Sequence, residues 1–428
     1  MDSETHRAIH AVWSIESARV IAGLARIVRD VGLAEELAQD ALLAALEQWP
    51  AAGIPDNPAA WLTATAKHRA LNTLRRGKML ERKHGELGYE LEAQAEPHKL
   101  IEQLEAALDD DVGDDLLRLI FTSCHPVLST EARVALTLRL LGGLTTDEIA
   151  RAFLVPEPTI AQRIVRAKRT LTDKQVAYEV PRGQELGARL ASVLEVVYLI
   201  FNEGYSATAG GDYMRPALCD EALRLGRVLA GLAPDEPEVH GLVALMELNA
   251  SRAAARTDAA GDPILLLEQD RGRWDQLAIR RGLEALERAE RLGQEPGPYV
   301  LQAGVTACHA RARVPEATDW GRIAALYRQL AAILQSPVVE LNRAVAVSMA
   351  EGPAAGLALA DALLSEPALQ RYHLLPSARA DLLEKLGRFE EAKTEFERAA
   401  RMTQNARQRE RLLQRAVNCG KPAPREPK

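Results

Sequence analysis

Apolar residues in the first half of the chain recur every three or four positions, which is the spacing of an amphipathic helix. The first such series is made of Ile15, Val20, Leu24, Ile27 and Val28, and the second of Leu37, Ala41, Leu42 and Leu46. No segment shows the strict alternation of apolar and polar residues, joined by hairpin turns, that indicates strands. The pattern therefore predicts an all-α protein.

Breaks in this helical pattern divide the chain into four parts. Residues 1–83 predict a compact bundle of about four helices, interrupted at 50–58 by the proline-rich sequence PAAGIPDNP. Residues 84–115 are polar and acidic, and residues 116–178 predict four short helices. Residues 179–428 form a longer, all-helical segment. We therefore expect two small helical domains, joined by an acidic linker and followed by a helical extension.

The chain has 428 residues and a net charge of −7, which is unusual for a protein that binds nucleic acid. The acidic charge is concentrated in residues 84–115, which hold 11 acidic residues and one basic residue, Lys99. Without this segment, residues 1–179 carry a small positive net charge. The two predicted small domains can therefore present locally basic surfaces to phosphates.

The sequence GGLTTDEIARAFLVPEPTIAQRIVRAKRTL at 142–171 predicts two helices joined by a tight turn. Thr145 and Glu148 fit a capping box at the start of the first helix. Pro158 suits the first turn of the second helix, because that position needs no backbone N–H donor. The buried face of the second helix is predicted to contain Ile160, Ile164, Ala167 and Leu171. This arrangement is typical of a helix-turn-helix.

Polar residues occupy the other faces of this second helix. They are Gln162, Arg163, Arg166 and Arg169. In the major groove, arginine suits O6 and N7 of guanine, and glutamine suits adenine. Arg166, Lys168, Arg169 and Lys174 are better placed to contact phosphates, which fix the register of a protein on DNA without reading its sequence. The alternative is an ordinary helical hairpin with a solvated basic face.

A second basic segment lies at residues 59–83, which contain seven basic residues and one acid. The basic residues are Lys67, Arg69, Arg75, Arg76, Lys78, Arg82 and Lys83. Cations hold the backbone of a single strand while aromatic rings stack on its bases, so this helix suits melted DNA. The alternative is a solvated basic face with Trp61 in the core of the bundle.

Three stretches, in this order, resemble the extracytoplasmic-function sigma factors of bacteria. They are DVGLAEELAQDALLAALEQW, NPAAWLTATAKHRALNTLRR and LSTEARVALTLRLLGGLTTDEIARAFLVPEPTIAQRIVRAKRTL, and they cover most of residues 10–174. The resemblance implies a first domain that docks on the β′ coiled coil of core RNA polymerase and opens the minus-10 element of promoter DNA. It implies a second domain that reads the minus-35 element and contacts the β flap.

The resemblance also implies roles for individual residues. Polymerase docking is expected from Glu36, Gln39 and Asp40, although the helix dipole alone explains acids near a helix start. Minus-10 contacts are expected from Asp56, Asn57, Trp61, Lys67, Arg69, Arg75 and Arg76, with Asp56 and Asn57 at the position where a flipped base is captured. Minus-35 contacts are expected from Thr159, Gln162, Arg163, Arg166, Lys168 and Arg169. Pro158 departs from the family, which commonly has glycine at that position.

The acidic linker of such factors runs through channels of the polymerase that otherwise hold nucleic acid. On this basis, one hypothesis is that five aspartates mimic phosphates there. They are Asp109, Asp110, Asp111, Asp114 and Asp115. A merely solvated linker is the alternative.

The extension, residues 179–428, is similar to the tetratricopeptide-like C-terminal extension of one subgroup of these factors. Residues 379–402 and 341–364 each predict two helices that meet at a glycine, Gly387 and Gly352 respectively. Stacked repeats of this kind create a concave surface. We therefore expect the extension to regulate the factor, through a regulatory partner or a ligand.

One stretch of the extension, VYLIFNEGYSATAGGDY at 197–213, concentrates aromatic residues, which make up only 4% of the chain. Its candidates for a ligand or docking pocket are Phe201, Asn202, Glu203, Tyr205 and Tyr213. A packed helix end followed by a glycine-rich turn is the alternative.

The sequence disfavours several other classes of protein. The four cysteines are far apart and form no Cys-x-x-Cys pair, which argues against a disulfide framework and a structural zinc site. We find no phosphate-binding loop and no nucleophile motif, so we expect no enzyme, metal or cofactor. There is no secretory signal and no apolar run long enough to span a bilayer, so we expect a soluble, cytoplasmic protein.

Two functions therefore compete, and an enzyme housed in the extension around Asn202, Glu203 and Tyr205 is a third, disfavoured hypothesis. The first is a sigma factor whose extension regulates it. The second is a conventional helix-turn-helix regulator with a ligand- or partner-sensing repeat domain. The basic segment at 61–83 favours the first, because a conventional regulator has no use for a strand-opening helix.

Overall fold

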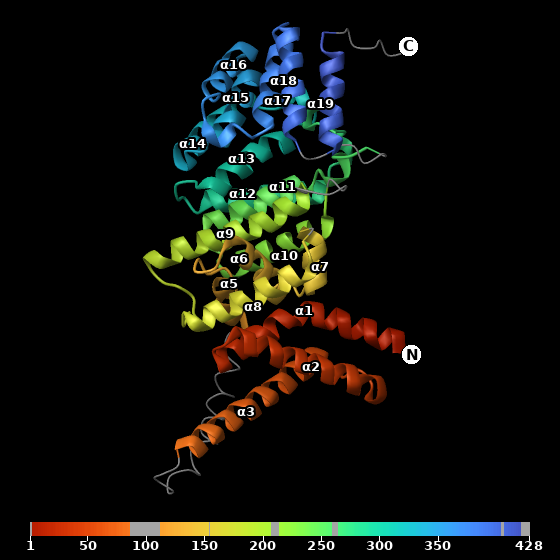
Figure 1. Cartoon of the computed structure of the whole chain (residues 1–428), viewed down its shortest axis with the longest axis vertical. Coiled ribbons are helices and arrows are strands. Elements are labelled where there is room, and N and C mark those ends of the chain that lie inside the picture. The colour runs from red at the N-terminus through yellow and green to blue at the C-terminus, as the bar shows by residue number, and fades with distance from the viewer. Residues whose placement is uncertain are drawn as a thin grey trace. The chain divides into compact units, whose positions relative to one another are not determined.

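The structure is a computed structural model that describes residues 2–85, 112–153, 155–206, 214–258, 264–403 and 406–420. Within these ranges the regular elements are helices and no strand occurs, which confirms the predicted all-α class. The chain forms two compact units, residues 1–199 and residues 200–428. Figure 1 labels the helices along the chain.

The first unit begins with three long helices, α1 (Asp2–Val28), α2 (Val31–Ala52) and α3 (Pro58–Gly85). Each of the three packs against the other two. Small buried side chains on α2, such as Ala34 and Ala41, allow this close approach. The Asp30 carboxylate caps α2 by accepting the backbone N–H of Leu33 at 2.8 Å. These contacts form the predicted helical bundle, but within residues 2–85 it has three long helices and not about four.

The loop between α2 and α3 is shorter than the proline-rich sequence suggests. Helix α2 continues through Pro50 to Ala52, and Gly53 ends it with a positive φ of 87°. The connection is therefore confined to residues 53–57. Proline removes one backbone donor from a helix. Because Pro50 lies in the last turn of α2, little of the helix follows it.

Four further helices complete the expected second domain: α5 (Val112–Ser123), α6 (Thr130–Leu140), α7 (Thr146–Phe153) and α8 (Glu157–Asp173). The predicted capping box is present at the start of α7. The Thr145 hydroxyl accepts the N–H of Glu148 at 3.2 Å, and the Glu148 carboxylate accepts the N–H of Thr145 at 2.8 Å. Helix α8 packs on α6 and α7, which gives the predicted helix-turn-helix.

The C-terminal end of the expected linker is part of the folded unit. Helix α5 begins at Val112, so the last residues of the 84–115 segment are helical. Asp115 is buried, and its carboxylate pairs with Arg118 at 2.7 Å and Arg26 at 3.1 Å. This aspartate therefore joins α1 to α5 and does not sit on a solvated linker. Asp109, Asp110 and Asp111 lie outside the described residues.

Helix α9 (Gln184–Tyr205) contributes residues 184–199 to the first unit and residues 200–205 to the second. In the first unit, Arg133 of α6 is buried and donates to the Ser192 hydroxyl and, at 3.0 Å, to the Glu195 carboxylate. The start of the predicted extension is therefore packed on the second domain.

Within the described residues after the end of α9, ten more helices form the second unit. They are α10 (Pro216–Leu232), α11 (Pro237–Ala250), α12 (Gln276–Arg291), α13 (Pro298–Arg311), α14 (Trp320–Leu334), α15 (Pro337–Glu351), α16 (Pro353–Ala362), α17 (Leu374–Lys385), α18 (Phe389–Met402) and α19 (Ala406–Asn418). Short 3-10 turns lie at Ala253–Ala255, Leu266–Glu268, Arg271–Arg273, Pro315–Ala317 and Pro367–Leu369. From α10 onward each of these helices packs on the next, and α11 also packs on α13.

The two glycine-centred hairpins of the extension are present as predicted. Helices α15 and α16 meet at Gly352, which has a φ of 104°, and α17 and α18 are connected through Gly387, which has a φ of 74°. Positive φ angles favour glycine, which explains why this residue stands at both turns. A shared core that includes Leu357, Leu383 and Phe396 joins the two hairpins. The tetratricopeptide-like character of the whole extension stays a prediction.

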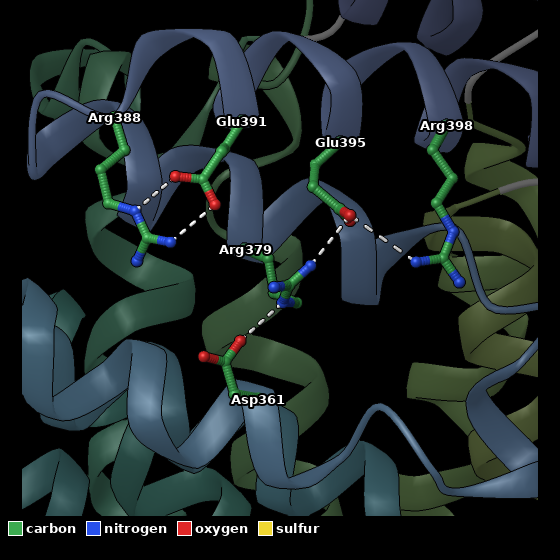
Figure 2. A network of polar contacts seen from close by, with 6 residues as sticks. All are labelled: Asp361, Arg379, Arg388, Glu391, Glu395 and Arg398. Carbon is green, nitrogen blue, oxygen red and sulfur yellow. Dashed lines mark hydrogen bonds and ion pairs between the residues drawn. The ribbon is translucent and has the colours of Figure 1, made fainter.

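Ion pairs connect the helices of this part of the extension, as Figure 2 shows. Arg379 of α17 pairs with Asp361 of α16 at 2.8 Å and with Glu395 of α18 at 2.9 Å. Its side chain is mostly buried, so the guanidinium needs these partners to offset its lost hydration. One arginine thus holds three consecutive helices in register.

The described residues also bear on membranes, metals and disulfides. None of the described helices is long and apolar enough to cross a bilayer. In the same part of the chain, no group of three or more His, Cys, Asp or Glu side chains is placed to hold a metal ion. All four cysteines are free thiols.

Candidate nucleic-acid interface

Helix α8 is positioned by its buried face. Ile160, Ile164, Ala167 and Leu171 are all buried against α6 and α7, as the apolar spacing predicts. Pro156 is the N-cap residue, and Pro158 lies in the first turn of the helix. A proline there removes a backbone donor that has no partner within the helix. Pro158 is therefore compatible with the turn, although the resembled family commonly has glycine.

The opposite face of α8 is open to solvent. Gln162, Val165, Arg166 and Arg169 are exposed, whereas Thr159 and Arg163 are half-buried. The Arg169 guanidinium lies 3.3 Å from the Asp173 carboxylate, one turn later, but its side chain is 81% exposed. A weak surface pair of this kind is readily exchanged for a phosphate. The face therefore offers an amide, an apolar side chain and two guanidinium groups to a DNA groove.

Lys168 does not belong to this open face. Its ammonium group pairs with the carboxylate of Glu35, which lies on α2 and is almost completely buried. The same carboxylate also accepts hydrogen bonds from Arg139 of α6 and from the Gln39 amide, each at 2.7 Å. Nearby, the Thr172 hydroxyl donates to Asp30 at 2.9 Å. Lys168 is thus held between the two small domains in this conformation.

The basic helix α3 is only partly open. Arg75 and Arg76 are exposed, and Lys67 is half-buried. Arg69 lies 3.5 Å from Asp40 of α2 in a partly exposed ion pair. The side chains of Lys78, Arg82 and Lys83 lie outside the described residues. Arg75 and Arg76 are therefore the described cations of α3 that are most accessible to DNA.

Aromatic and amide groups surround the start of α3. Trp61 is half-buried and makes an edge contact with the buried Trp49, with ring centroids 5.4 Å apart. The Asn57 side-chain oxygen accepts the N–H of Ala60 at 3.0 Å and so caps α3. Asp56 and Asn57 are both exposed. The geometry brings Asp56, Asn57 and Trp61 to the same end of α3.

The three candidate docking residues on α2 differ in their surroundings. Glu36 is exposed, whereas Gln39 and Asp40 are half-buried. Gln39 donates to Glu35, and Asp40 pairs with Arg69. Of the three, Asp40 contacts another helix, Gln39 bonds within α2, and Glu36 is the most exposed to solvent.

Family models match three parts of the chain. Residues 16–79 match sigma-70 region 2, and residues 118–171 match sigma-70, region 4. Residues 189–290 match a family of unknown function (DUF6596). The expectation of two sigma-type domains followed by a helical domain is confirmed by these matches and by the fold.

The chain is also similar in sequence to two known proteins. The uncharacterized protein R00370 of Rhizobium meliloti (strain 1021) is 42% identical over 396 residues, which cover 91% of this chain and 90% of that protein. The chain belongs to the family of that protein. The ECF RNA polymerase sigma factor SigK of Mycobacterium ulcerans (strain Agy99) is 29% identical over 160 residues, which cover 36% of this chain and 78% of SigK. The chain is thus a distant homologue of an ECF sigma factor, with region 2, region 4 and DUF6596 segments.

The aromatic stretch that the sequence singles out lies at the start of the DUF6596 segment. Phe201 is buried, and its ring stacks on that of Tyr205 at 5.5 Å. The Arg256 guanidinium lies 3.5 Å from the centre of the Tyr205 ring and also donates to the Tyr205 carbonyl. Glu203 pairs with Arg215. These contacts fix the end of α9, so a packed helix end accounts for them.

The remaining candidates of this stretch are less well defined by the structure. Asn202 is exposed, and Tyr213 lies outside the described residues. A ligand role for the five residues stays a prediction.

A cavity of about 260 Å³ lies elsewhere in the second unit, between α12, α13 and α14, and Leu286, Val300 and Leu326 are among the residues that line it.

Sequence reasoning missed two features of the region 2 and region 4 domains. The sequence predicts no role for Glu35, but its carboxylate is the centre of the contact between α2, α6 and α8. No local pattern indicates this, because its partners lie on distant helices. The second feature is the exposed apolar side chain of Val165 on the open face of α8. The sequence does indicate this position, because Val165 stands three residues after Gln162 and four before Arg169, which is the spacing of one helix face.

Proposed function

We propose that this chain is a sigma factor that binds core RNA polymerase and directs transcription initiation at specific promoters. The observation that supports this most strongly is the open face of α8 in the region 4 domain, with Gln162, Arg166 and Arg169 exposed. The same chain carries a region 2 domain with exposed arginines on α3. A protein that only binds duplex DNA needs the first of these surfaces but not the second.

In this proposal the N-terminal half of α8 enters the major groove of the minus-35 element. Gln162 reads an adenine, and Arg166 reads a guanine through O6 and N7. Arg169 contacts phosphate, and Thr159 and Arg163 flank the contact. Lys168 contacts phosphate only after it leaves Glu35. The face is suited to this role because its buried stripe fixes the helix on α6 and α7.

The minus-10 element is bound by α3 and the loop before it. Arg75 and Arg76 hold the backbone of the separated strand, supported by Lys67 and Arg69. Asp56 and Asn57 receive a base that has left the duplex, with the exposed edge of Trp61 beside them. Extruding a base costs a few kcal/mol, which contacts with the polymerase offset. The capping bond of Asn57 uses its oxygen, so its amide N–H groups stay available as donors.

Polymerase docking is assigned to the exposed side of α2 for the β′ coiled coil and to the region 4 domain for the β flap. Glu36 is the most accessible of the docking residues. Gln39 and Asp40 join it by exchanging their contacts with Glu35 and Arg69 for contacts with the polymerase. The helical extension regulates these steps as a tetratricopeptide-like surface that binds a regulatory partner or ligand.

The experiment that tests the proposal combines the purified full chain with core RNA polymerase and a set of promoter fragments. We expect transcripts that start at defined positions and need both components. Sequence-specific DNA binding without any polymerase-dependent transcript would instead identify a conventional helix-turn-helix regulator.

A matched pair of variants links the result to α8. Arg166→Ala removes a base-reading group and should weaken promoter binding by about 1–3 kcal/mol. Arg182→Ala removes another exposed arginine, from the segment before α9, and should leave promoter binding unchanged. Equal losses in both variants would show that general charge, and not the face of α8, carries the binding.

A further inference from the structure

An exposed apolar side chain stands in the middle of the open face of α8. Val165 is 64% exposed, although large apolar residues on this helix are otherwise buried. Val127 is the other exposed large apolar side chain among the described residues of the region 4 match, and it is 37% exposed. Single exposed apolar residues are common on protein surfaces. The position of Val165, and not its exposure alone, therefore carries the argument.

The helical repeat places Val165 among the base-reading candidates. Gln162 lies three residues before it and Arg169 four residues after it, which puts all three on one stripe of the helix surface. Arg166 borders the stripe, and the exposed Ala161 lies one turn before Val165. Ile160, Ile164, Ala167 and Leu171 occupy the other side of the helix and anchor it. Any DNA that Gln162 and Arg169 touch is therefore also beside Val165.

The edges of the bases in the major groove carry donors, acceptors and one apolar group, the C5-methyl group of thymine. A valine side chain can match only the last of these. The neighbouring amide and guanidinium groups match adenine, guanine and phosphate, so together the face offers a partner for each kind of group.

We propose that Val165 reads the methyl group of a thymine in the minus-35 element, with Ala161 packing beside it. The inference rests on the proposed function, because it specifies a sequence preference of the same α8 face. Val165 thereby makes the contact that distinguishes thymine from a base with a bare C5 position. It contributes specificity, whereas Arg169 contributes affinity for any sequence.

The test uses the full chain assembled with core RNA polymerase. Promoter fragments that support transcription are first selected from a pool randomised over the minus-35 element. Each thymine of the selected element is then replaced by deoxyuridine, which removes only the methyl group. Binding of the holoenzyme should weaken at one position by about fourfold, as expected for the loss of one buried methyl-sized contact.

Variants at residue 165 show whether this loss belongs to Val165. Val165→Ala should bind the thymine promoter about as weakly as the wild type binds its deoxyuridine form, and should no longer distinguish the two. Val165→Ile keeps the apolar contact and should keep the discrimination. Val127→Ala is the matched control for an exposed valine of the same domain, and it should behave as the wild type.

Three results would overturn the inference while leaving the sigma-factor assignment intact. The first is a selected element that requires no thymine, and the second is equal binding to thymine and deoxyuridine at every position. In the third, Val165→Ala weakens holoenzyme assembly but keeps the discrimination, which would assign Val165 to a protein contact. Failure of the assignment itself is distinguishable, because then no promoter fragment is selected at all.

Discussion

The Glu35 carboxylate on α2 accepts a hydrogen bond from the Arg139 guanidinium on α6 at 2.7 Å, although the two residues are 104 positions apart. The same carboxylate also pairs with Lys168 of α8, and the side chain of Glu35 is only 5% exposed. One buried acid therefore joins the region 2 and region 4 domains. Promoter elements centred about 25 base pairs apart are separated by about 85 Å of duplex. Under the proposed function, α2 and α8 must therefore part when both elements are bound.

Chain length permits this separation. About 26 residues connect α3 to α5, and an extended chain of that length spans up to about 90 Å. The contact at Glu35 thus opposes promoter binding, and its strength affects how readily the two domains part.

We expect Glu35→Gln to weaken the contact between the two domains by roughly 1–3 kcal/mol. This is less than the cost of breaking a wholly buried pair, because Arg139 and Lys168 keep about a fifth of their side-chain surface in water. The change also frees the Lys168 ammonium group to bind a phosphate. The slope of the logarithm of the DNA-binding constant against the logarithm of the salt concentration should therefore steepen by the contribution of about one charge. Thermal unfolding and binding at several salt concentrations measure the two effects.

Glu47→Gln is the control for this change, because it removes an exposed carboxylate from the same helix. It should leave the unfolding temperature and the salt dependence close to those of the wild type. A similar shift in both variants would show that the net charge of α2, and not the buried contact, is responsible.

The exposed arginines of α3 should matter for separated strands and not for duplex DNA. We expect the double change Arg75→Ala and Arg76→Ala to weaken binding to a fork-shaped minus-10 template and to reduce its salt slope by up to about 1.4. Binding to a minus-35 duplex should stay the same. Gel-shift titrations of the holoenzyme on the two templates measure the difference.

A second arginine pair provides the control for this prediction. Arg280 and Arg281 are adjacent and exposed on α12, far from the region 2 domain in sequence. Changing both to alanine removes the same charge and should leave binding to either template unaltered. Equal weakening on the duplex and on the fork would contradict a role in strand separation.

The second unit should lose stability in mildly acidic solution because of His309. Burial, together with the nearby charges of Arg252 and Arg271, lowers the pKa of His309 to about 4. In the unfolded chain its pKa is about 6.5, so between these values the unfolded state binds more protons. Stability therefore falls as the pH drops from 6.5 towards 4, by about 2 kcal/mol at pH 5.

Urea unfolding of the full chain at pH 7 and pH 5 measures this effect. His309→Phe keeps a ring against Trp320, whose ring centre lies 5.2 Å away, but cannot bind a proton. Its stability should therefore change less between the two pH values than that of the wild type. His68→Gln alters an exposed histidine and should retain the pH dependence of the wild type. An unchanged pH dependence in His309→Phe would exclude this histidine as the cause.

Two glycine-to-alanine changes in the second unit should alter the stability of the protein in opposite directions. A Cβ atom on Gly241 of α11 would lie 2.6 Å from the backbone nitrogen of Val300 on α13, so Gly241→Ala should destabilise the protein by about 1–3 kcal/mol. A Cβ atom on Gly231 of α10 meets nothing within 4 Å. Gly231→Ala should therefore stabilise its helix by up to about 1 kcal/mol. Thermal unfolding distinguishes them, and a shift of the same sign in both would contradict the close packing of α11 on α13.

Features that depend on residues within one or two helical turns of each other could be predicted from the amino-acid sequence. The capping box of Thr145 and Glu148, the buried stripe of α8 and the glycine turns at Gly352 and Gly387 are present as expected. Periodicity and capping are local properties, because the hydrogen bonds and side-chain positions involved are fixed by the geometry of a single helix. The sigma-type character of the first two domains followed from such patterns together with the family resemblance.

The packing of helices that are distant in sequence determines which polar side chains are open to a partner and which are paired within the protein. Lys168 and Arg169 are neighbours on one basic helix, yet Lys168 is paired with Glu35 and Arg169 is exposed. Likewise, Asp115 ends an acidic run but is buried between Arg26 and Arg118. Such outcomes depend on which helix faces meet across long stretches of chain. Because the spacing of residues along one helix carries no information about the charge on another, no local pattern could have indicated them.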